Sequence, residues 1–135
     1  MKLKIIILIL VFIFIFAIYT SAENRLFPNL KVRSETIRFV TAYNVGDEKQ
    51  CDDTPCISAN NKNICEALDR GEKHAAANFV PLGTILYIDK IGYVIVSDRM
   101  NRRYKNRVDI AFKKHEKVKA LKFGKQKLMV KILEK

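Results

Sequence analysis

The sequence has little glycine and proline, and it lacks the short motifs of several common enzyme classes. Five glycines and three prolines are spread over 135 residues without an internal period, which excludes a repeat array. No Gly-x-Ser-x-Gly nucleophile motif and no glycine-rich phosphate loop is present. The two histidines, His74 and His115, are too few and too dispersed for a metal site, and we expect both at the surface. The length allows one domain, so large barrels and doubly wound nucleotide-binding enzymes are excluded.

Acidic residues are scarce in the last quarter of the chain, and this scarcity accounts for the whole net charge of +11. Residues 99–135 hold 14 basic and three acidic residues, whereas residues 23–98 hold nine basic and 11 acidic ones. Such a segment attracts anionic polymers without sequence specificity. We expect no specific nucleic-acid partner, because few aromatic residues interleave the basic ones and because the N-terminus predicts export.

The N-terminus has the pattern of a secretory signal peptide. Two lysines precede fifteen apolar residues, Ile5–Tyr19, and the small residues of Thr20-Ser21-Ala22 follow. We predict that residues 1–22 are a signal peptide cleaved after Ala22, and that the protein is secreted, periplasmic or otherwise part of the cell envelope. The alternative is an uncleaved membrane anchor, although the apolar run is shorter than the roughly 20 residues of a membrane span.

Three cysteines remain after export, in a compartment where disulfides persist. An odd number favours one bridge and one further thiol. We predict a disulfide between Cys56 and Cys65, which closes a short loop, and leave Cys51 as a thiol or an intermolecular partner. A zinc site is the weaker alternative, because no paired ligand motif at zinc-finger spacing is present.

The pattern of β-branched and aromatic residues predicts a mainly β fold. Gly124 lies where the C-cap of a helix belongs, and Val118 and Leu121 lie on one side of that helix with lysines on the other. Many strands, one helix and long loops favour a small closed β-barrel. We expect a linker or arm over residues 23–35 and a barrel domain over residues 36–135. The expected strands of this domain are 36–43, 84–89, 93–97, 107–112 and 126–133. We also expect a long loop at 44–63, a short helix or strand at 64–68 and a helix at 113–123.

Two aspartates are the candidate chemical groups. Asp98 ends the apolar stretch YVIVSD, and Asp109 lies inside RVDIAF, eleven residues later. A carboxylate beside a buried strand is costly unless it is paired or used. A hairpin-like connection would bring both carboxylates to one rim, where different surroundings would separate their pKa values. The alternative is that they are structural ion-pair partners of the arginines between them.

Five short motifs occur in an order that resembles the bacterial 3D domain, which is named for three aspartates. They are Thr41-Ala42-Tyr43, Thr54-Pro55-Cys56-Ile57-Ser58-Ala59, Ala76-Ala77-Asn78 with Pro81-Leu82-Gly83-Thr84, Asp98-Arg99-Met100 and Arg107-Val108-Asp109. The same order is similar to the rare lipoprotein A family and to the C-terminal part of membrane-bound lytic transglycosylase A. The resemblance covers residues 37–133 and implies a six-stranded double-psi β-barrel with one short helix before the last strand.

The resemblance also implies an activity, the cleavage of peptidoglycan glycan strands. It implies that Asp109 is the catalytic acid, that Asp98 positions or tunes it, and that Thr41, Tyr43 and Asn78 lie in the substrate groove. Asn78 stands nearest to the position of the family's first aspartate, and the basic segment 99–106 replaces a glycine-rich loop. From the basic charge between Asp98 and Asp109, we add Arg99 and Arg107 as candidate substrate-binding residues.

A lytic transglycosylase needs one carboxyl that stays protonated near neutral pH. Val108 and Ile110 would desolvate Asp109 and Asp98 would add a like charge, whereas Arg107 would oppose both effects. We expect no cofactor or metal, a monomer, and as partner the peptidoglycan glycan strand or another anionic wall polymer. Membrane contact is expected only through an uncleaved N-terminal segment. Two alternatives remain open: a barrel that binds wall polysaccharide without cutting it, and a basic exported protein that binds anionic polymers through residues 99–135.

Overall fold

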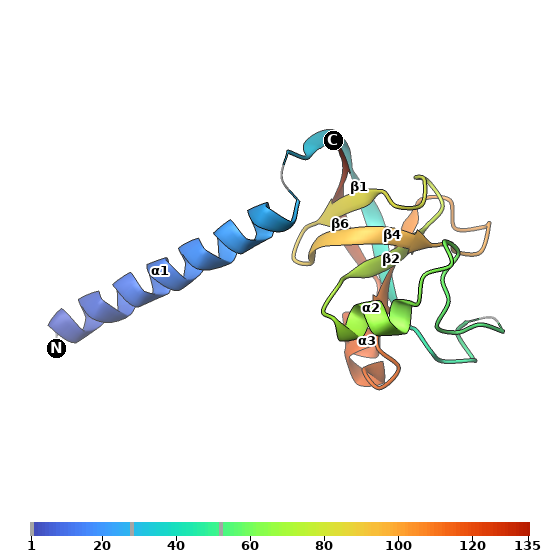
Figure 1. Cartoon of the computed structure of the whole chain (residues 1–135), viewed down its shortest axis with the longest axis horizontal. Coiled ribbons are helices and arrows are strands. Elements are labelled where there is room, and N and C mark those ends of the chain that lie inside the picture. Colours follow the sequence, from blue (N-terminus) through green and yellow to red (C-terminus); the bar gives the residue numbers. More distant parts are fainter. Residues whose placement is uncertain (1, 28, 52) are drawn as a thin grey trace. The chain divides into compact units, whose positions relative to one another are not determined.

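The computed structural model describes residues 2–27, 29–51 and 53–135, and it divides into two compact units at Lys31 (Figure 1). Each unit is described by itself. In chain order the elements are α1 (Lys2–Leu26), β1 (Lys31–Asn44), α2 (Ile64–Asp69), β2 (His74–Ala77), β3 (Ile85–Ile88), β4 (Gly92–Asp98), β5 (Arg107–Phe112), α3 (Lys117–Phe123) and β6 (Gln126–Glu134).

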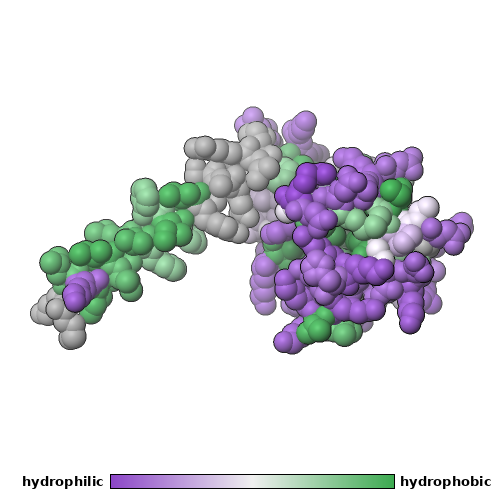
Figure 2. All heavy atoms as spheres, turned by 60° about the horizontal axis from the view of Figure 1, so that its bottom comes forward, coloured by the Kyte–Doolittle hydropathy of each residue, from purple (hydrophilic) through white to green (hydrophobic). Residues whose placement is uncertain are grey.

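The first unit contains the helix α1, which is apolar on every side over residues 5–18. Large apolar side chains between Leu3 and Ile18 are more than half exposed, and Figure 2 shows a continuous hydrophobic surface along them. No helix among the described residues has both the length and the hydropathy that a membrane crossing requires.

The second unit is a closed barrel of six strands in the order β1-β5-β2-β4-β3-β6. The pairs β1·β5 and β2·β4 are parallel, and the other four pairs are antiparallel. This confirms the predicted mainly β fold, with a closed six-stranded barrel and a short helix before the last strand. Because side chains alternate along a strand, each strand has one set of residues inside the barrel and one set on its outer surface.

The inside of the barrel is a core of aliphatic side chains. Val40, Leu86, Val94 and Val108 are fully buried there. A smaller apolar cluster, built around Ile64 of α2, lies beside the barrel. The outward-facing residues between these core positions therefore form the functional surfaces.

Strand β2 is the element that the sequence did not predict. All four of its residues, His74–Ala77, are buried, and alanine carries little strand propensity. Strand β1 also begins earlier than predicted, at Lys31, where it pairs with Glu134 of β6. The expected linker over residues 23–35 is thus divided between the end of α1, residues 27–30 and the start of β1.

Helix α3 differs from its predicted form. It begins at Lys117 rather than at Lys113, and Gly124 ends it as predicted, with a φ of 61° and an N–H bond to the carbonyl of Ala120. Val118 and Leu121 are 63% and 78% exposed, so the side of the helix that carries them does not pack on the barrel.

Candidate functional site

Strand register brings the two candidate aspartates into one row of the outer surface, on either side of Ala76. Thr41 of β1 pairs with Asp109 of β5, Asp109 pairs with Ala76 of β2, and Ala76 pairs with Asp98 of β4. The predicted hairpin between the two aspartate-bearing strands is wrong, because β2 lies between them. The two carboxylates nevertheless converge, separated by the small side chain of Ala76.

A cavity of about 500 Å³ lies over this row, and both carboxylates line it. Its walls come from the end of β1, the loop of residues 50–61 and the loop of residues 98–104. Loops therefore turn a plain outer barrel face into a recessed site that is open to solvent on one side.

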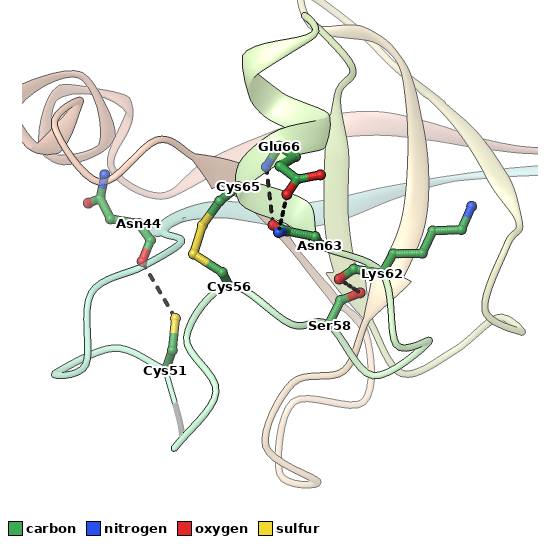
Figure 3. Close-up of a disulfide and its surroundings, with 8 residues drawn as sticks. All are labelled: Asn44, Cys51, Cys56, Ser58, Lys62, Asn63, Cys65 and Glu66. Carbon is green, nitrogen blue, oxygen red and sulfur yellow. Dashed lines mark hydrogen bonds between the residues drawn. A yellow bond between two sulfur atoms is a disulfide. The ribbon is translucent and has the colours of Figure 1, made fainter.

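The loop of residues 50–61 is fixed by the predicted disulfide (Figure 3). Cys56 is bonded to Cys65 of α2, with the two Cα atoms 5.3 Å apart. The side chain of Asn63 caps α2 by accepting from the backbone N–H of Glu66. Cys51 lies outside the disulfide, where its thiol donates to the carbonyl of Asn44. A disulfide of this kind indicates an oxidising, extracytoplasmic environment.

Asp109 is a half-buried carboxyl with an unusual proton affinity. Burial raises the pKa of Asp109 above its usual value, while the Thr41 hydrogen bond and the Arg107 charge lower it by less. The like charge of Asp98, which the sequence offered as a second cause, is not a cause of this shift. Desolvation is thus the main reason why Asp109 holds a proton more tightly than an exposed aspartate.

The hydroxyl of Thr41 suits both protonation states of Asp109. Its Oγ1 lies 2.8 Å from Asp109 Oδ1 and 3.4 Å from the carbonyl oxygen of Val108. A hydroxyl has one hydrogen to donate and can also accept. It therefore donates to an ionised Asp109, or accepts from a protonated one while donating to the carbonyl.

Asp98 has a different environment, because three donors already hold it. Its Oδ1 accepts from the backbone N–H groups of Ala59 and Arg99, at 3.1 and 2.8 Å, and its Oδ2 accepts from the Tyr43 hydroxyl at 3.3 Å. None of the ion pairs among the described residues includes Asp98 or Asp109. The ion-pair alternative is therefore not what the structure contains, and Asp98 instead ties the loop of residues 50–61 to the end of β4.

Tyr43 lines the cavity near both carboxylates. Burial is the first cause that raises the pKa of the Tyr43 phenol, and the charges of Asp98 and Asp109 raise it further. The phenol accordingly stays protonated at neutral pH and serves as a hydrogen-bond donor inside the cavity.

Two predicted substrate-binding residues hold the protein together instead. Asn78 Nδ2 donates to the carbonyls of Met100, Asn101 and Tyr104, and its Oδ1 accepts from Met100 N. Arg99 also lines the cavity, but its guanidinium donates to the carbonyls of Ala77 and Val80. Both side chains therefore fix the wall that residues 98–104 form.

The remaining predicted residue, Arg107, contacts a ring that sequence reasoning missed. Its guanidinium lies 4.1 Å from the ring centroid of Tyr104, and Arg103 lies 4.8 Å from the same ring. Tyr104 lines the cavity and Arg107 does not. Nothing in the sequence singles out Tyr104, since it lies in a basic loop without periodicity.

His74 was expected at the surface, and this prediction is wrong. The side chain is fully buried, with Nδ1 3.0 Å from the hydroxyl of Ser97 and Nε2 3.1 Å from a carboxylate oxygen of Glu72. Hydrogen bonds from His74 and Arg70 lower the pKa of Glu72. Ser97 is also fully buried, so this Ser–His–Glu chain satisfies polar groups inside the fold and presents no hydroxyl to a substrate.

No protein-family model and no curated protein matches this chain. The interpretation of the site consequently depends on its geometry. That geometry comprises a desolvated carboxyl with a hydroxyl partner that can donate or accept, a protonated phenol and a second carboxylate, gathered in one open cavity.

Proposed function

We propose that this protein is a double-psi β-barrel of the 3D type that cleaves the glycan strands of peptidoglycan as a lytic transglycosylase. The order of motifs supports the family assignment, and the closed barrel with two parallel strand pairs is compatible with it. In this proposal residues 1–22 direct export, and the cavity over Asp98 and Asp109 receives the substrate.

The observation that carries the proposal is the state of Asp109. A general acid must hold its proton near neutral pH and must also reach the substrate. Burial raises the pKa of Asp109, and the same carboxyl lines a cavity of about 500 Å³. Among the described residues, Oδ2 of Asp109 has no hydrogen bond, which leaves it for a ligand.

The reaction requires only one carboxyl. The Asp109 proton passes to the glycosidic oxygen while the bond from that oxygen to the anomeric carbon breaks. The 6-hydroxyl oxygen of the same sugar then bonds to the anomeric carbon and returns its proton to Asp109, which yields a 1,6-anhydro product. The Thr41 hydroxyl can accept a hydrogen bond from protonated Asp109 and donate one to ionised Asp109, because its oxygen lies 2.8 Å from Asp109 Oδ1 and 3.4 Å from the Val108 carbonyl oxygen.

Asp98 has a supporting role in this scheme. A hydrolase would use two carboxylates as acid and base or nucleophile, but the oxygens of Asp98 already accept three hydrogen bonds. Asp98 therefore positions Tyr43 and the loop of residues 50–61, and Tyr43 donates to the bound sugar. Because three hydrogen bonds already hold the Asp98 carboxylate, it is less suited to act as a second catalytic group, and this favours the intramolecular transglycosylase reaction over hydrolysis.

The test is the analysis of muropeptides after purified sacculi are incubated with the protein. We expect 1,6-anhydro products from the wild type and a loss of about 10²–10⁴-fold in rate for Asp109→Asn, the range that general acid catalysis contributes. Asp98→Asn is the matched control, since it changes the other carboxylate of the same cavity. We expect Asp98→Asn to retain a measurable rate.

Absence of 1,6-anhydro products from folded wild-type protein at catalytic concentration would contradict the proposal. Reducing-end products without the anhydro ring would indicate a hydrolase. Circular dichroism of both variants separates a lost acid from a lost fold.

A second function is favoured by one observation, the structural use of Asn78 and Asp98. Both stand at or near aspartate positions of the family motif, and both hold loops of this protein. The cavity would then bind wall glycan without cutting it. Retention on sacculi with no released fragments, unchanged by Asp109→Asn, would select this function.

A further inference from the structure

The outer surface over β3, β6 and the adjoining parts of β1 and β4 carries a second cluster of side chains, which we call the lysine–aromatic face. It is separate from the cavity, which covers β5, β2 and the ends of β1 and β4. The face consists of Ile37, Phe39, Tyr87, Tyr93, Lys125, Lys127, Met129 and Lys131.

Strand register places these residues on one side of the sheet. Ile37 pairs with Met129 and Phe39 pairs with Lys127 across β1 and β6. Lys131 pairs with Tyr87, which in turn pairs with Tyr93. Directly paired residues point to the same face, and the residues between them are core side chains such as Val130 and Leu86.

The face is both apolar and basic. Ile37 is 62% exposed and Phe39 is 40% exposed. Lys125 and Lys127 place their ammonium groups 4.1 and 5.3 Å from the ring centroid of Phe39. Lys131 lies 5.9 Å from the ring of Tyr87, so two of the three aromatic rings of the face, Phe39 and Tyr87, have ammonium groups close to them.

Two acids share the strand rows of this face, Glu35 and the exposed Asp89, whose backbone N–H donates to the carbonyl of Met129. Glu35 pairs with Lys131 in the register, and its carboxylate lies 3.8 Å from the Lys131 ammonium. Lys125 and Lys127 are in none of the ion pairs among the described residues. The face therefore has positive charge that the protein itself does not neutralise.

We propose that the lysine–aromatic face docks on the surface of an anionic lipid bilayer. Lysines near such a surface are attracted by its negative potential, and aromatic side chains favour the interface between headgroups and acyl chains. Exposed Ile37 and Phe39 favour a bilayer over a soluble anionic polymer, because the acyl region of a bilayer offers an apolar phase for these side chains and a charged polymer does not. Sequence reasoning gave membrane contact to the N-terminal segment alone, and this face is a second, independent contact.

The absence of tryptophan from the sequence makes the proposal testable in the full chain. Phe39→Trp introduces a single tryptophan into the face, and Leu121→Trp introduces one on α3, at a position that is 78% exposed. Each protein is reconstituted with vesicles of phosphatidylglycerol and brominated phosphatidylcholine. Because α1 is present in both proteins, any difference in quenching reports on the barrel unit.

We expect the fluorescence of the Phe39→Trp protein to be quenched and blue-shifted in anionic vesicles, and that of the Leu121→Trp protein to remain as in water. Adding Lys125→Glu and Lys127→Glu to Phe39→Trp should reduce the quenching to the level found in neutral vesicles. Lys114→Glu with Lys122→Glu is the matched control, because it changes the net charge equally at exposed residues outside the face. The control pair should leave the quenching of the Phe39→Trp protein nearly unchanged.

Three outcomes would overturn the proposal. Equal quenching at positions 39 and 121 would mean that only α1 brings the barrel near lipid. An equal effect of the two charge-reversal pairs would mean that net charge acts without a defined face. A response of the tryptophan at position 39 to soluble polyanion but not to vesicles would assign the face to a polymer.

Discussion

The two outer surfaces of the barrel are built in different ways. The cavity surface is covered by loops, and a disulfide, Asn78 and Asp98 hold these loops through fixed bonds. The lysine–aromatic face is mostly bare strand, with side chains that contact one another between neighbouring strands. Polar side chains hold loops in place at the cavity surface, because a binding site requires a fixed arrangement of its groups.

Strand β1 shows how one element serves both surfaces. Its outward residue Ile37 pairs with β6, Phe39 pairs with both β6 and β5, and Thr41 pairs with β5 opposite Asp109. A strand that changes neighbours along its length can therefore supply a docking residue and a site residue from one alternating pattern. The difference between the surfaces comes from the loops and not from the strands.

The largest effect on stability is expected from removal of the disulfide. Cys56→Ala with Cys65→Ala opens a loop of nine residues' separation, which costs about 2–3 kcal/mol in the chain-entropy estimate. Urea denaturation with and without reductant measures the loss. Cys51→Ala is the matched control, because Cys51 lies outside the disulfide.

This variant also separates the two surfaces. We expect glycan cleavage to fall, because Cys56 lines the cavity, while the quenching by lipid of a tryptophan placed at position 39 stays unchanged. Equal loss of both properties would show that the surfaces are not independent.

The sequence predicted the parts of this fold that have strong local signals. The strands around Val94 and Val108 are β-branched runs, and the short loop between Cys56 and Cys65 favoured their pairing. Strand β2 has no such signal, because its His74 and three alanines become a strand only through their two neighbours. The burial of His74 likewise depends on Ser97 and Glu72, which belong to no histidine motif.

The sequence predicted which residues line the candidate site better than it predicted how their side chains are hydrogen-bonded. Asp98 and Asp109 were identified as acids beside buried strands, and they do line one cavity. Their different roles depend on bonds that the sequence cannot express, such as the donation from Ala59 N to Asp98. Asn78 and Arg99 were expected to face substrate, but the carbonyls of nearby loops take their donors.

A smaller loss is expected from Asn78→Asp, which restores the residue that the family motif has near this position. A carboxylate cannot donate, so the three carbonyls that Asn78 Nδ2 serves would lose their partner and face a negative charge. We expect a loss of about 1–3 kcal/mol in the free energy of unfolding. Asn101→Asp, in the same loop but exposed, is the control, and higher stability or higher activity of Asn78→Asp would contradict this account.

A still smaller effect, of opposite sign, is expected from Asp109→Asn at neutral pH. Burial raises the folded-state pKa of Asp109 above its unfolded value, so this group favours folding at low pH and loses that contribution as pH rises through the folded pKa. The variant should therefore be more stable than the wild type at pH 7. The difference should shrink as pH falls below the unfolded pKa, and urea denaturation from acidic to neutral pH, with Asp98→Asn as control, measures it.

The smallest effect is expected on the lysine–aromatic face. Lys125→Gln with Lys127→Gln removes the ammonium groups near Phe39, and exposed cation–π contacts contribute only about 0.5–1 kcal/mol each. Because both lysines are exposed, the lower value applies to each contact, and the free energy of unfolding should fall by about 1 kcal/mol in urea denaturation. Because the lysines contribute so little to folding, a large loss of lipid docking in the same variant would identify binding as their role. A loss of stability as great as that of the disulfide variant would instead make this face part of the folded framework.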